Sequence, residues 1–471
     1  MRRAWLGVFF CLLFSPVRAD VPEGQILANL WRYSFTPTGA GARAAGMADA
    51  FIAVSDDGTA ASWNPAGLAQ LRAPEFSVVF GGNHRIMSLK DFTALDGSSR
   101  FSSFRAADSN RMLDFASAAI PLDLFSKPVT LQASWQRMYD LNFQSDPFIT
   151  ERVNAGGAAS QTFLLHQGTD LAGDIRLYSL SGAVQLTQRM ALGASFNIWK
   201  GDWSTQADIQ ANRIAGGPPS SNFLFFRQSN HMSGRNFSLG LLFTYPKFNV
   251  GLVYHSPFFA DYQIATTTLS NLPNPFQGDT SQQTTLRFPK RLGLGFAWHP
   301  TDTWTAALDL QYNQWKDMTV AAVPPDLPEL NFLDFQPAGS TSTRNTLSAN
   351  AGAEYLIVRE HSVIPIRFGI AYEPQGGMDP TLRSSVNYWV LACGTGFNTN
   401  AWKLDVAVQY RWANFRTGQF MEPEGMLRYP RTPDAFGSAR AQEWRVNMSL
   451  IYRISRSEGL SKILHKVFVG D

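Results

Sequence analysis

The 471-residue chain is 45% hydrophobic and 13% aromatic, with only 16% charged residues, a composition that favours β structure. Its formal net charge is +3, and removing the three arginines of residues 1–19 from the 40 basic residues leaves 37, equal to the 37 acidic ones. This balance gives no indication of a nucleic-acid partner or an acidic substrate.

The N-terminus has the pattern of a secretory signal peptide that spans residues 1–19. Arg2 and Arg3 form its charged start, residues 4–14 form an apolar run of 11, and Val17–Ala19 provides a small-residue cleavage site. A transmembrane anchor is the alternative, but 11 apolar residues are too few to cross a bilayer. We therefore expect an exported protein.

The two cysteines argue against a lipid anchor and a disulfide framework. Cys11 lies within the apolar run without the small residues that precede a lipidated cysteine, and cleavage leaves Cys393 alone. No later stretch approaches 18 consecutive apolar residues, which excludes a helical membrane protein. An exported chain is then either a soluble periplasmic protein or an outer-membrane barrel.

Apolar and polar residues alternate from about residue 75 onward. In residues 402–412, tryptophan, leucine, valine and tyrosine occupy one face, while Lys403, Asp405 and Arg411 occupy the other. A soluble sandwich would alternate too, but aromatic residues stand at both ends of the apolar faces. Ten residues at about 3.3 Å each, tilted by about 40–45°, project to roughly 23–25 Å, which matches the ~25 Å apolar band of a membrane barrel.

The alternation predicts an all-β fold, a 14-stranded antiparallel transmembrane β-barrel. Tight turns, such as 187–188, 245–247, 299–302, 359–360 and 398–400, alternate with long loops, which indicates that the turns and both termini are periplasmic. The predicted strands are 75–83, 113–120, 128–139, 174–187, 189–203, 232–246, 247–258, 283–298, 303–317, 344–358, 361–373, 384–397, 401–414 and 442–455. The predicted long loops are 140–173, 204–231, 259–282, 318–343 and 415–441.

Two segments lie outside the predicted barrel of residues 73–455. Residues 20–72 are rich in alanine and glycine and too long for a simple tail, so we expect an N-terminal hatch that plugs the lumen. Residues 456–471 carry apolar residues at helical spacing and are interpreted as a periplasmic C-terminal tail.

The chain has no motif for catalysis. No nucleophile elbow, HExxH, CxxC or phosphate-binding glycine loop is present. The glycines at 293–295 and 394–396 lie in strands, where they ease curvature or make space beside the plug. His255 and His299 stand near strand ends, where a solvated role is commoner than metal binding. We expect no catalytic residue, metal site or cofactor, although an enzyme built into a barrel remains an alternative.

One N-terminal stretch resembles the start of the mature FadL/TodX family of outer-membrane transporters. It runs from Gly41-Ala42-Arg43-Ala44-Ala45-Gly46-Met47 through Ser55-Asp56-Asp57-Gly58 to Trp63-Asn64-Pro65-Ala66-Gly67. Ala48-Asp49 stands where the family usually has two glycines. Residues 291–305 resemble the family's turn between its eighth and ninth strands, whereas the chain continues past Ser455, where the family commonly ends.

The resemblance implies a 14-stranded barrel, closed by a hatch, for passive uptake of long-chain fatty acids or aromatic hydrocarbons. Ligand would bind among the extracellular loops, move toward the hatch and leave sideways through the wall. Each CH₂ kept from water is worth about 0.8 kcal/mol, which favours such an exit. The expected partners are the hydrophobic ligand, outer-membrane lipid and the barrel assembly machinery, with a monomer expected. The alternative is a FadL-like barrel that serves as a protein-binding shuttle or secretion partner.

The resemblance also suggests gate residues in the hatch. Gly46, Asn64, Pro65 and Ala66 match the family motif and are the gate candidates. Asn64 is expected to cap a tight turn that Pro65 makes rigid. The alternative is that this motif only folds the plug.

Two further groups are candidates for ligand binding. Arg287, Arg291, Lys403 and Arg411 are predicted to face the lumen, where they would hold a carboxylate or pair with Asp309, Asp405, Glu354 or the plug. Phe223, Phe225 and Phe226, with Leu224, form an apolar cluster in a predicted surface loop, where they would contact ligand or membrane or form the loop's own core.

Overall fold

The computed structural model describes residues 37, 39–94, 99–124, 127–146, 148–153, 160–271, 276–321, 328–333, 336–378, 384–417 and 435–454. The predicted signal peptide and the tail at 456–471 lie outside the described residues and stay predictions. The first helical elements are α3 (Ala42–Gly46), η2 (Ala60–Ser62) and η3 (Pro65–Gln70), and further turns are η4 (Trp315–Asp317) and η5 (Ala338–Ser340). Among the helices of the described ranges, none has the length and hydropathy needed to span a membrane.

Most of the described chain is strand. The first strands are β1 (Glu75–Ala94), β2 (Ser99–Phe101), β3 (Phe104–Leu124), β4 (Lys127–Asp140), β5 (Phe143–Ser145), β6 (Phe148–Val153) and β7 (Gln161–Thr187). The middle strands are β8 (Met190–Ala215), β9 (Ser220–Thr244), β10 (Phe248–His255), β11 (Phe258–Ser270), β12 (Phe276–Phe288), β13 (Arg291–Thr301) and β14 (Trp304–Asn313). The last strands are β15 (Thr319–Val320), β16 (Leu330–Asn331), β17 (Thr346–Val358), β18 (Val363–Met378), β19 (Ser385–Asn398), β20 (Trp402–Thr417) and β21 (Ala435–Arg453).

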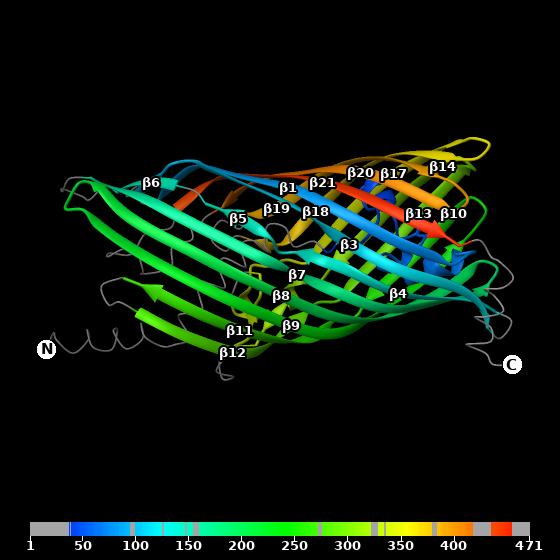
Figure 1. Cartoon of the computed structure of the whole chain (residues 1–471), viewed down its shortest axis with the longest axis horizontal. Helices are drawn as coiled ribbons and strands as arrows, with labels where there is room; N and C mark the ends of the chain where they lie inside the picture. Colours follow the sequence, from blue (N-terminus) through cyan, green and yellow to red (C-terminus); the bar gives the residue numbers. More distant parts are fainter. Residues whose placement is uncertain are drawn as a thin grey trace.

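Antiparallel pairing closes these strands into a barrel (Figure 1). The ladder runs through β1, β3, β4, β7, β8, β9, β10, β13, β14, β17, β18, β19, β20 and β21, and β21 pairs back with β1. After short breaks, β11 extends β10 along β9, and β12 leads into β13. In the described ranges the fold is therefore a 14-stranded antiparallel barrel, and the predicted strand count is confirmed.

Several strands extend far beyond the predicted ranges. β7 has 27 residues, β8 has 26 and β9 has 25, so the loops predicted at 140–173 and 204–231 were mostly wrong. The loop at 259–282 is largely β11 and β12, while the loop at 415–441 overlaps residues outside the described ones. The turn predicted at 299–302 is shorter, because β13 continues to Thr301. Beyond the apolar belt the outward residues become polar, as at Gln206, Asp208 and Gln210 of β8, while inward residues such as Ile209 stay buried and backbone pairing continues.

The outer face of the barrel is a continuous apolar belt. Large side chains such as Phe76, Leu180, Phe368 and Trp389 are exposed on strands all around the wall. Aromatic residues pair on neighbouring strands: the Tyr410 and Trp444 ring centroids lie 4.6 Å apart. A soluble protein would not leave so large an apolar surface in water, so this is the surface of a membrane-embedded barrel.

Residues 39–71, here called the lumenal segment, lie inside the barrel toward the end that carries the short turns (Figure 1). α3 contacts β18, β19, β20 and β21, and η3 contacts β4, β7, β8 and β9. Wall glycines permit this close packing: a Cβ added at Gly193 would lie 2.3 Å from the Ala66 nitrogen, and one at Gly369 would lie 2.3 Å from the Met47 carbonyl carbon. Gly293, Gly295 and Gly394 likewise face the segment, which confirms the prediction that such glycines make space beside a plug.

Candidate functional site

Ion pairs fasten the lumenal segment to the wall. Arg43 of α3 donates to both carboxylate oxygens of Glu354 on β17, at 3.1 and 2.9 Å, and pairs with Asp56. Arg367 on β18 links Glu354, at 2.6 Å, to Asp405 on β20, at 2.7 Å. Burial lowers the pKa of Arg43, but Asp56 and Glu354 outweigh that effect and hold it well above its usual value. The segment is therefore tied to three strands by a buried charge network.

Hydrogen bonds between wall side chains and the backbone of the segment add to this attachment. Ser449 accepts from the Ala42 amide at 2.6 Å, and Asn350 donates to the Ala48 carbonyl at 2.7 Å. Gln409 donates to the Ala45 carbonyl at 3.0 Å. One carboxylate oxygen of Asp309 on β14 accepts from the Phe51 and Ile52 amides, at 2.7 and 2.8 Å. These side chains satisfy backbone groups that the segment buries outside regular structure.

Asn64 organises the turn that precedes η3. Its side-chain oxygen accepts from the Ala66 amide at 3.1 Å, as expected of an N-cap, and Pro65 occupies the first helical position. Its amide group donates to the Ile52 carbonyl at 3.2 Å and to the Leu241 carbonyl of β9 at 3.1 Å. One fully buried side chain thus joins the helix start, the preceding loop and the wall.

Ala48 and Asp49 adopt left-handed backbone conformations, with φ of 51° and 65°. Glycine is favoured in this region, and aspartate tolerates it better than most residues. The Asp49 carboxylate accepts a hydrogen bond from Gln409 at 3.3 Å. Burial raises the pKa of Asp49 to about 6, and the nearby Glu373 contributes to the rise.

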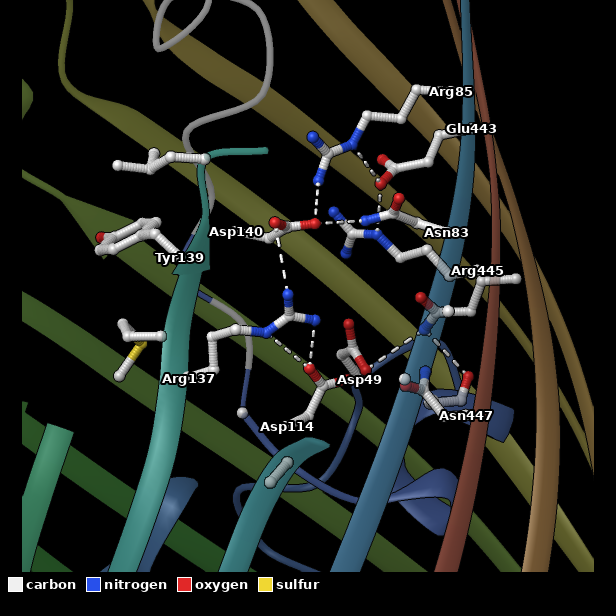
Figure 2. Close-up of a pocket in the computed structure, with 18 of the residues that line it drawn as sticks. Asp49, Asn83, Arg85, Asp114, Arg137, Tyr139, Asp140, Glu443, Arg445 and Asn447 are labelled. Atoms are coloured by element: carbon white, nitrogen blue, oxygen red, sulfur yellow. Dashed lines mark hydrogen bonds and ion pairs between the residues drawn. The ribbon is translucent and has the colours of Figure 1, made fainter. Parts of the chain in front are cut away.

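A cavity of about 180 Å³ lies directly above the lumenal segment, between β1, β4 and β21. Gly39, Ala40, Ala45 and Asp49 line its floor. Figure 2 shows Arg85 and Asn83 from β1, Arg137 and Tyr139 from β4, and Glu443 and Arg445 from β21 around it. The cavity therefore combines the segment with three strands that are far apart in the sequence.

One side of the cavity is a charged network (Figure 2). Arg85 pairs with Asp140 at 3.0 Å and with Glu443 at 3.4 Å, and Arg445 pairs with Glu443 at 3.0 Å. Arg137 pairs with Asp140 at 3.3 Å and with Asp114 of β3 at 2.5 Å. The arginines and carboxylates of this wall largely neutralise one another.

The opposite side of the cavity is apolar. Met138, Tyr139, Leu141, Phe143 and Leu171 line it and belong to a larger cluster inside the barrel. That cluster is rich in stacked rings, with centroids 5.0 Å apart for Trp199 and Phe258 and 4.7 Å apart for Phe258 and Phe288. An apolar molecule would meet an apolar surface, part aliphatic and part aromatic, from the cavity across β7, β8 and β11.

In the wall beside the cavity, the backbone ladder between β3 and β4 stops part-way along the strands. Backbone pairing of these strands ends at Phe115 and Gln136. Above that pair, β3 continues along β1, and β4 continues along β7 to Asp140, without a ladder between them in the described residues. Side chains bridge this β3–β4 seam: Arg137 reaches Asp114, and Asn110 donates to the Asn142 carbonyl at 3.2 Å. Above Phe115 and Gln136, the described residues of β3 and β4 are therefore joined by side chains and not by a backbone ladder.

Comparisons with known proteins identify this fold. No protein-family model and no curated protein sequence matches the chain. A FadL homologue from Pseudomonas aeruginosa superposes with a TM-score of 0.63 at 12% identity, covering 89% of this chain and 100% of that one. The toluene transporter TodX of P. putida gives 0.55 at 12% identity, and the CymD monoaromatic hydrocarbon channel gives 0.51 at 14%, each covering 90% of this chain and 100% of its own. The chain has the fold of the FadL and TodX barrels.

This FadL-type fold also fixes the location of the chain. An even number of antiparallel strands with short turns at one end is the architecture of bacterial outer-membrane barrels. The chain is accordingly an outer-membrane barrel protein.

In the FadL-type barrel, all four gate candidates lie in the lumenal segment against the wall. A Cβ added at Gly46 would lie only 3.2 Å from the Gly394 Cα, so the segment and the wall are in close contact there. Asn64 makes the three hydrogen bonds described above. Pro65 and Ala66 face Gly193 and Gly240. Gly46 thus lies against β18 and β19, whereas Asn64, Pro65 and Ala66 lie against β8 and β9, and the role of all four as a gate remains a proposal.

The four basic ligand candidates are not equivalent. Arg411 is fully buried and paired with Glu373 and Glu443, which favours the structural alternative. Arg287 was predicted to face the lumen, but this is wrong: it stacks over Phe259 on the outer wall, while its neighbours Leu286 and Phe288 are buried. The β12–β13 break at 289–290 changes the alternation on which that prediction rested.

Arg291 and Lys403 do face the interior. Arg291 lies beside a space of about 20 Å³ lined by Ser62, Asn236 and His255, and no described carboxylate pairs with it. Burial raises the pKa of Asp57, but Lys403 and Arg43 outweigh that effect and hold it below its usual value. Arg291 is thus the candidate with an uncommitted charge, and Lys403 acts on the plug.

The phenylalanine cluster does not lie in a loop. Phe223, Phe225 and Phe226 belong to β9, where Leu224 and Phe226 are buried inside and the other two face outward. The prediction of a surface loop is corrected, because the strand continues beyond the apolar belt. Phe226 contributes to the interior apolar cluster that extends to the cavity, and its role in ligand binding stays a prediction.

The sequence interpretation missed most of the charged network. Arg85, Arg137, Asp140 and Glu443 were not singled out, although they dominate the cavity wall. Arg367 stood on the polar face of a predicted strand and was not connected with Glu354. Charged residues at inward positions of alternating strands are the signal that would have indicated these groups.

Proposed function

We propose that the chain is an outer-membrane channel for passive uptake of hydrophobic small molecules, with long-chain fatty acids or aromatic hydrocarbons as the substrate class. The lumenal segment serves as the hatch that closes the direct path to the periplasm. Ligand enters along the aromatic cluster, reaches the cavity above the hatch and leaves sideways through the β3–β4 seam into the membrane.

The observation that carries this proposal is the position of the seam. Backbone pairing between β3 and β4 stops at Phe115 and Gln136, and Gln136, Arg137 and Asp114 beside this point all line the cavity. A barrel wall normally keeps its ladder because unpaired backbone groups are costly in lipid. A break in pairing beside an internal cavity is therefore well placed to act as an exit.

The chemistry of the walls supports an apolar cargo. A molecule on the aromatic side of the cavity avoids water, and each CH₂ it buries contributes about 0.8 kcal/mol. The charged side is internally paired, so it offers little net attraction to an ion. Leaving through the seam keeps the cargo in apolar surroundings, whereas passage through the hatch would require breaking the Arg43 and Asn64 contacts.

Cross-linking the seam tests this route. The Met112 sulfur lies 3.7 Å from the Asn142 side-chain nitrogen across the seam. A Met112→Cys/Asn142→Cys variant, built on Cys393→Ser, is joined with a short bismaleimide in whole cells. We expect uptake of a radiolabelled fatty acid and of toluene to fall toward the level of a deletion strain.

The matched control joins two strands whose ladder is continuous. Ala194 on β8 and Leu239 on β9 are paired partners on the outer face, and cross-linking their cysteine variants should leave uptake unchanged. Equal uptake with an open and a cross-linked seam would remove the lateral exit. If even the unmodified protein gives no uptake above the deletion strain, the transport proposal itself fails.

A further inference from the structure

A second, separate hollow lies on the outer wall near the extracellular end. It has a volume of about 420 Å³ and is formed by β1, β3, β20 and β21. Lys90, Arg105 and Arg440 line it and are exposed, while their strand neighbours Leu89, Ala106 and Ala439 are buried toward the interior. Alternation along a strand therefore directs the three cations outward.

These cations lie close together on neighbouring strands. Ser88 of β1 is the paired partner of both Arg440 on β21 and Arg105 on β3. With strands about 4.8 Å apart, Arg440 and Arg105 are separated by roughly 10 Å at their backbones, with Lys90 one outward position along β1. Arg416, whose partner on β21 is Ser438, adds a fourth exposed cation beside the hollow.

Among the described residues, no carboxylate lines this hollow. Apart from the three cations, its lining consists of two serines, one asparagine, one glutamine, Phe415 and Ala439. No ion pair joins the four cations to a described acid, in contrast to the paired arginines of the lumen. Like charges on adjacent strands repel one another. An anion in the hollow would remove that repulsion.

Aromatic residues lie next to the hollow on its periplasmic side. Gln442 lines the hollow and donates to the Tyr410 hydroxyl, and Tyr410 stacks on Trp444 and Trp412 in the outer belt. Tyrosine and tryptophan occupy the level of the lipid headgroups in membrane barrels. Arg440 is four residues above Trp444 on the same strand, roughly 13 Å along it. The cations therefore stand at the height of the outermost polar part of the lipid.

We propose that Lys90, Arg105, Arg440 and Arg416 form a binding site for the phosphate groups of an outer-leaflet glycolipid, whose acyl chains lie along the aromatic belt below. Arginine and lysine donate to phosphate oxygens, and several donors in one hollow suit a headgroup that carries more than one phosphate. The site is independent of the lumen, since its side chains face away from the cavity.

The test measures lipid binding to the purified barrel by native mass spectrometry. The probes are an acylated disaccharide with two phosphates, the same glycolipid without phosphate, and inorganic phosphate. We expect tight binding of the phosphorylated glycolipid alone. A charged residue near an anionic headgroup is worth a factor of about five, so Lys90→Gln/Arg105→Gln should weaken binding about 25-fold.

Two control variants separate this site from general surface charge. Lys200→Gln/Arg235→Gln removes the same charge from exposed positions on β8 and β9 and should leave affinity unchanged. Arg105→Lys keeps the charge and should retain most binding. If Lys90→Gln/Arg105→Gln and the unaltered protein bind the phosphorylated glycolipid with equal affinity, the proposal is overturned. Equal binding of the phosphate-free glycolipid, or binding of inorganic phosphate that competes for the same residues, would overturn it as well.

Discussion

Removing the Asn64 side chain should loosen the lumenal segment without unfolding the barrel. Asn64→Ala deletes the N-cap bond to Ala66, worth about 1 kcal/mol. It also removes the donors to the Ile52 and Leu241 carbonyls, each worth about 1 kcal/mol net. The total of about 3 kcal/mol corresponds to an increase of roughly 150-fold in the population of the released segment.

Hydrogen exchange measured by mass spectrometry reports this population directly. The Phe51 and Ile52 amides donate to Asp309, so they exchange only when the segment leaves the wall. We expect peptides from residues 41–71 to exchange up to about 150-fold faster in Asn64→Ala, while peptides from β8 and β9 stay protected. Cells that carry the variant should also become sensitive to large hydrophilic antibiotics.

Two controls sharpen the interpretation. Asn64→Ser retains a capping side chain and loses only the two donor bonds, so its effect should be about 30-fold. Asn197→Ala removes a buried asparagine whose partners all lie on the wall, Ser179 on β7 and Asn236 and Ser238 on β9, and should not change exchange in the segment. If Asn64→Ala exchanges at the rate of the unaltered protein, these hydrogen bonds do not hold the hatch.

The remaining predictions concern three charged groups. Arg367→Met leaves Glu354 and Asp405 buried with fewer partners, which should lower the free energy of unfolding by about 3–5 kcal/mol. The midpoint of unfolding in guanidinium chloride should fall accordingly, and an unchanged midpoint would contradict the buried pairing. Asp49 has a pKa raised from 3.8 to about 6, so the stability it contributes is complete below pH 4 and disappears as pH rises through 6. Asp49→Asn should therefore be more stable than the unaltered protein at pH 8, by up to about 3 kcal/mol, and indistinguishable at pH 3.5. Arg291→Gln should lower fatty-acid affinity about tenfold and leave toluene uptake unchanged, if Arg291 holds a carboxylate; parallel losses for both substrates would assign it a structural role.

The sequence predicted the barrel well because the membrane imposes a simple rule on it. Most predicted strands lie on one observed strand, the main exception at 283–298 covering β12 and β13, since outward residues such as Trp402 and Trp444 must be apolar and their neighbours need not be. The rule weakens beyond the apolar belt, where β7, β8 and β9 continue with polar residues on the outer face and apolar residues such as Ile209 and Phe226 on the inner face. This is why Phe223 and Phe225 were assigned to a loop, and why strand ends were placed too early.

The site was only partly predictable, for a different physical reason. The alternation places Arg411 and Asp405 in the lumen, but it does not state which charges meet across the barrel. Arg411 pairs with Glu373 on β18 and Glu443 on β21, and these partners are set by strand register and tilt. A single break at 289–290 was enough to reverse the predicted direction of Arg287. Pairing inside a barrel is thus a property of the closed sheet and not of any one strand.

The unequal attachment of the lumenal segment to the wall agrees with the proposed exit through the β3–β4 seam. Its charged and polar anchors come from β14, β17, β20 and β21, through Asp309, Glu354, Gln409 and Ser449, with further hydrogen bonds to β9 and β10 through Asn64 and Asn249. On the other side of the lumen, Ser117 and Gln132 hold only the Gly58 carbonyl, below the point where β3 and β4 separate. A ligand in the cavity therefore reaches the seam by displacing the Arg137–Asp114 bridge, with every anchor of the hatch still in place. Transport and closure of the pore toward the periplasm are in this way assigned to opposite sides of one barrel.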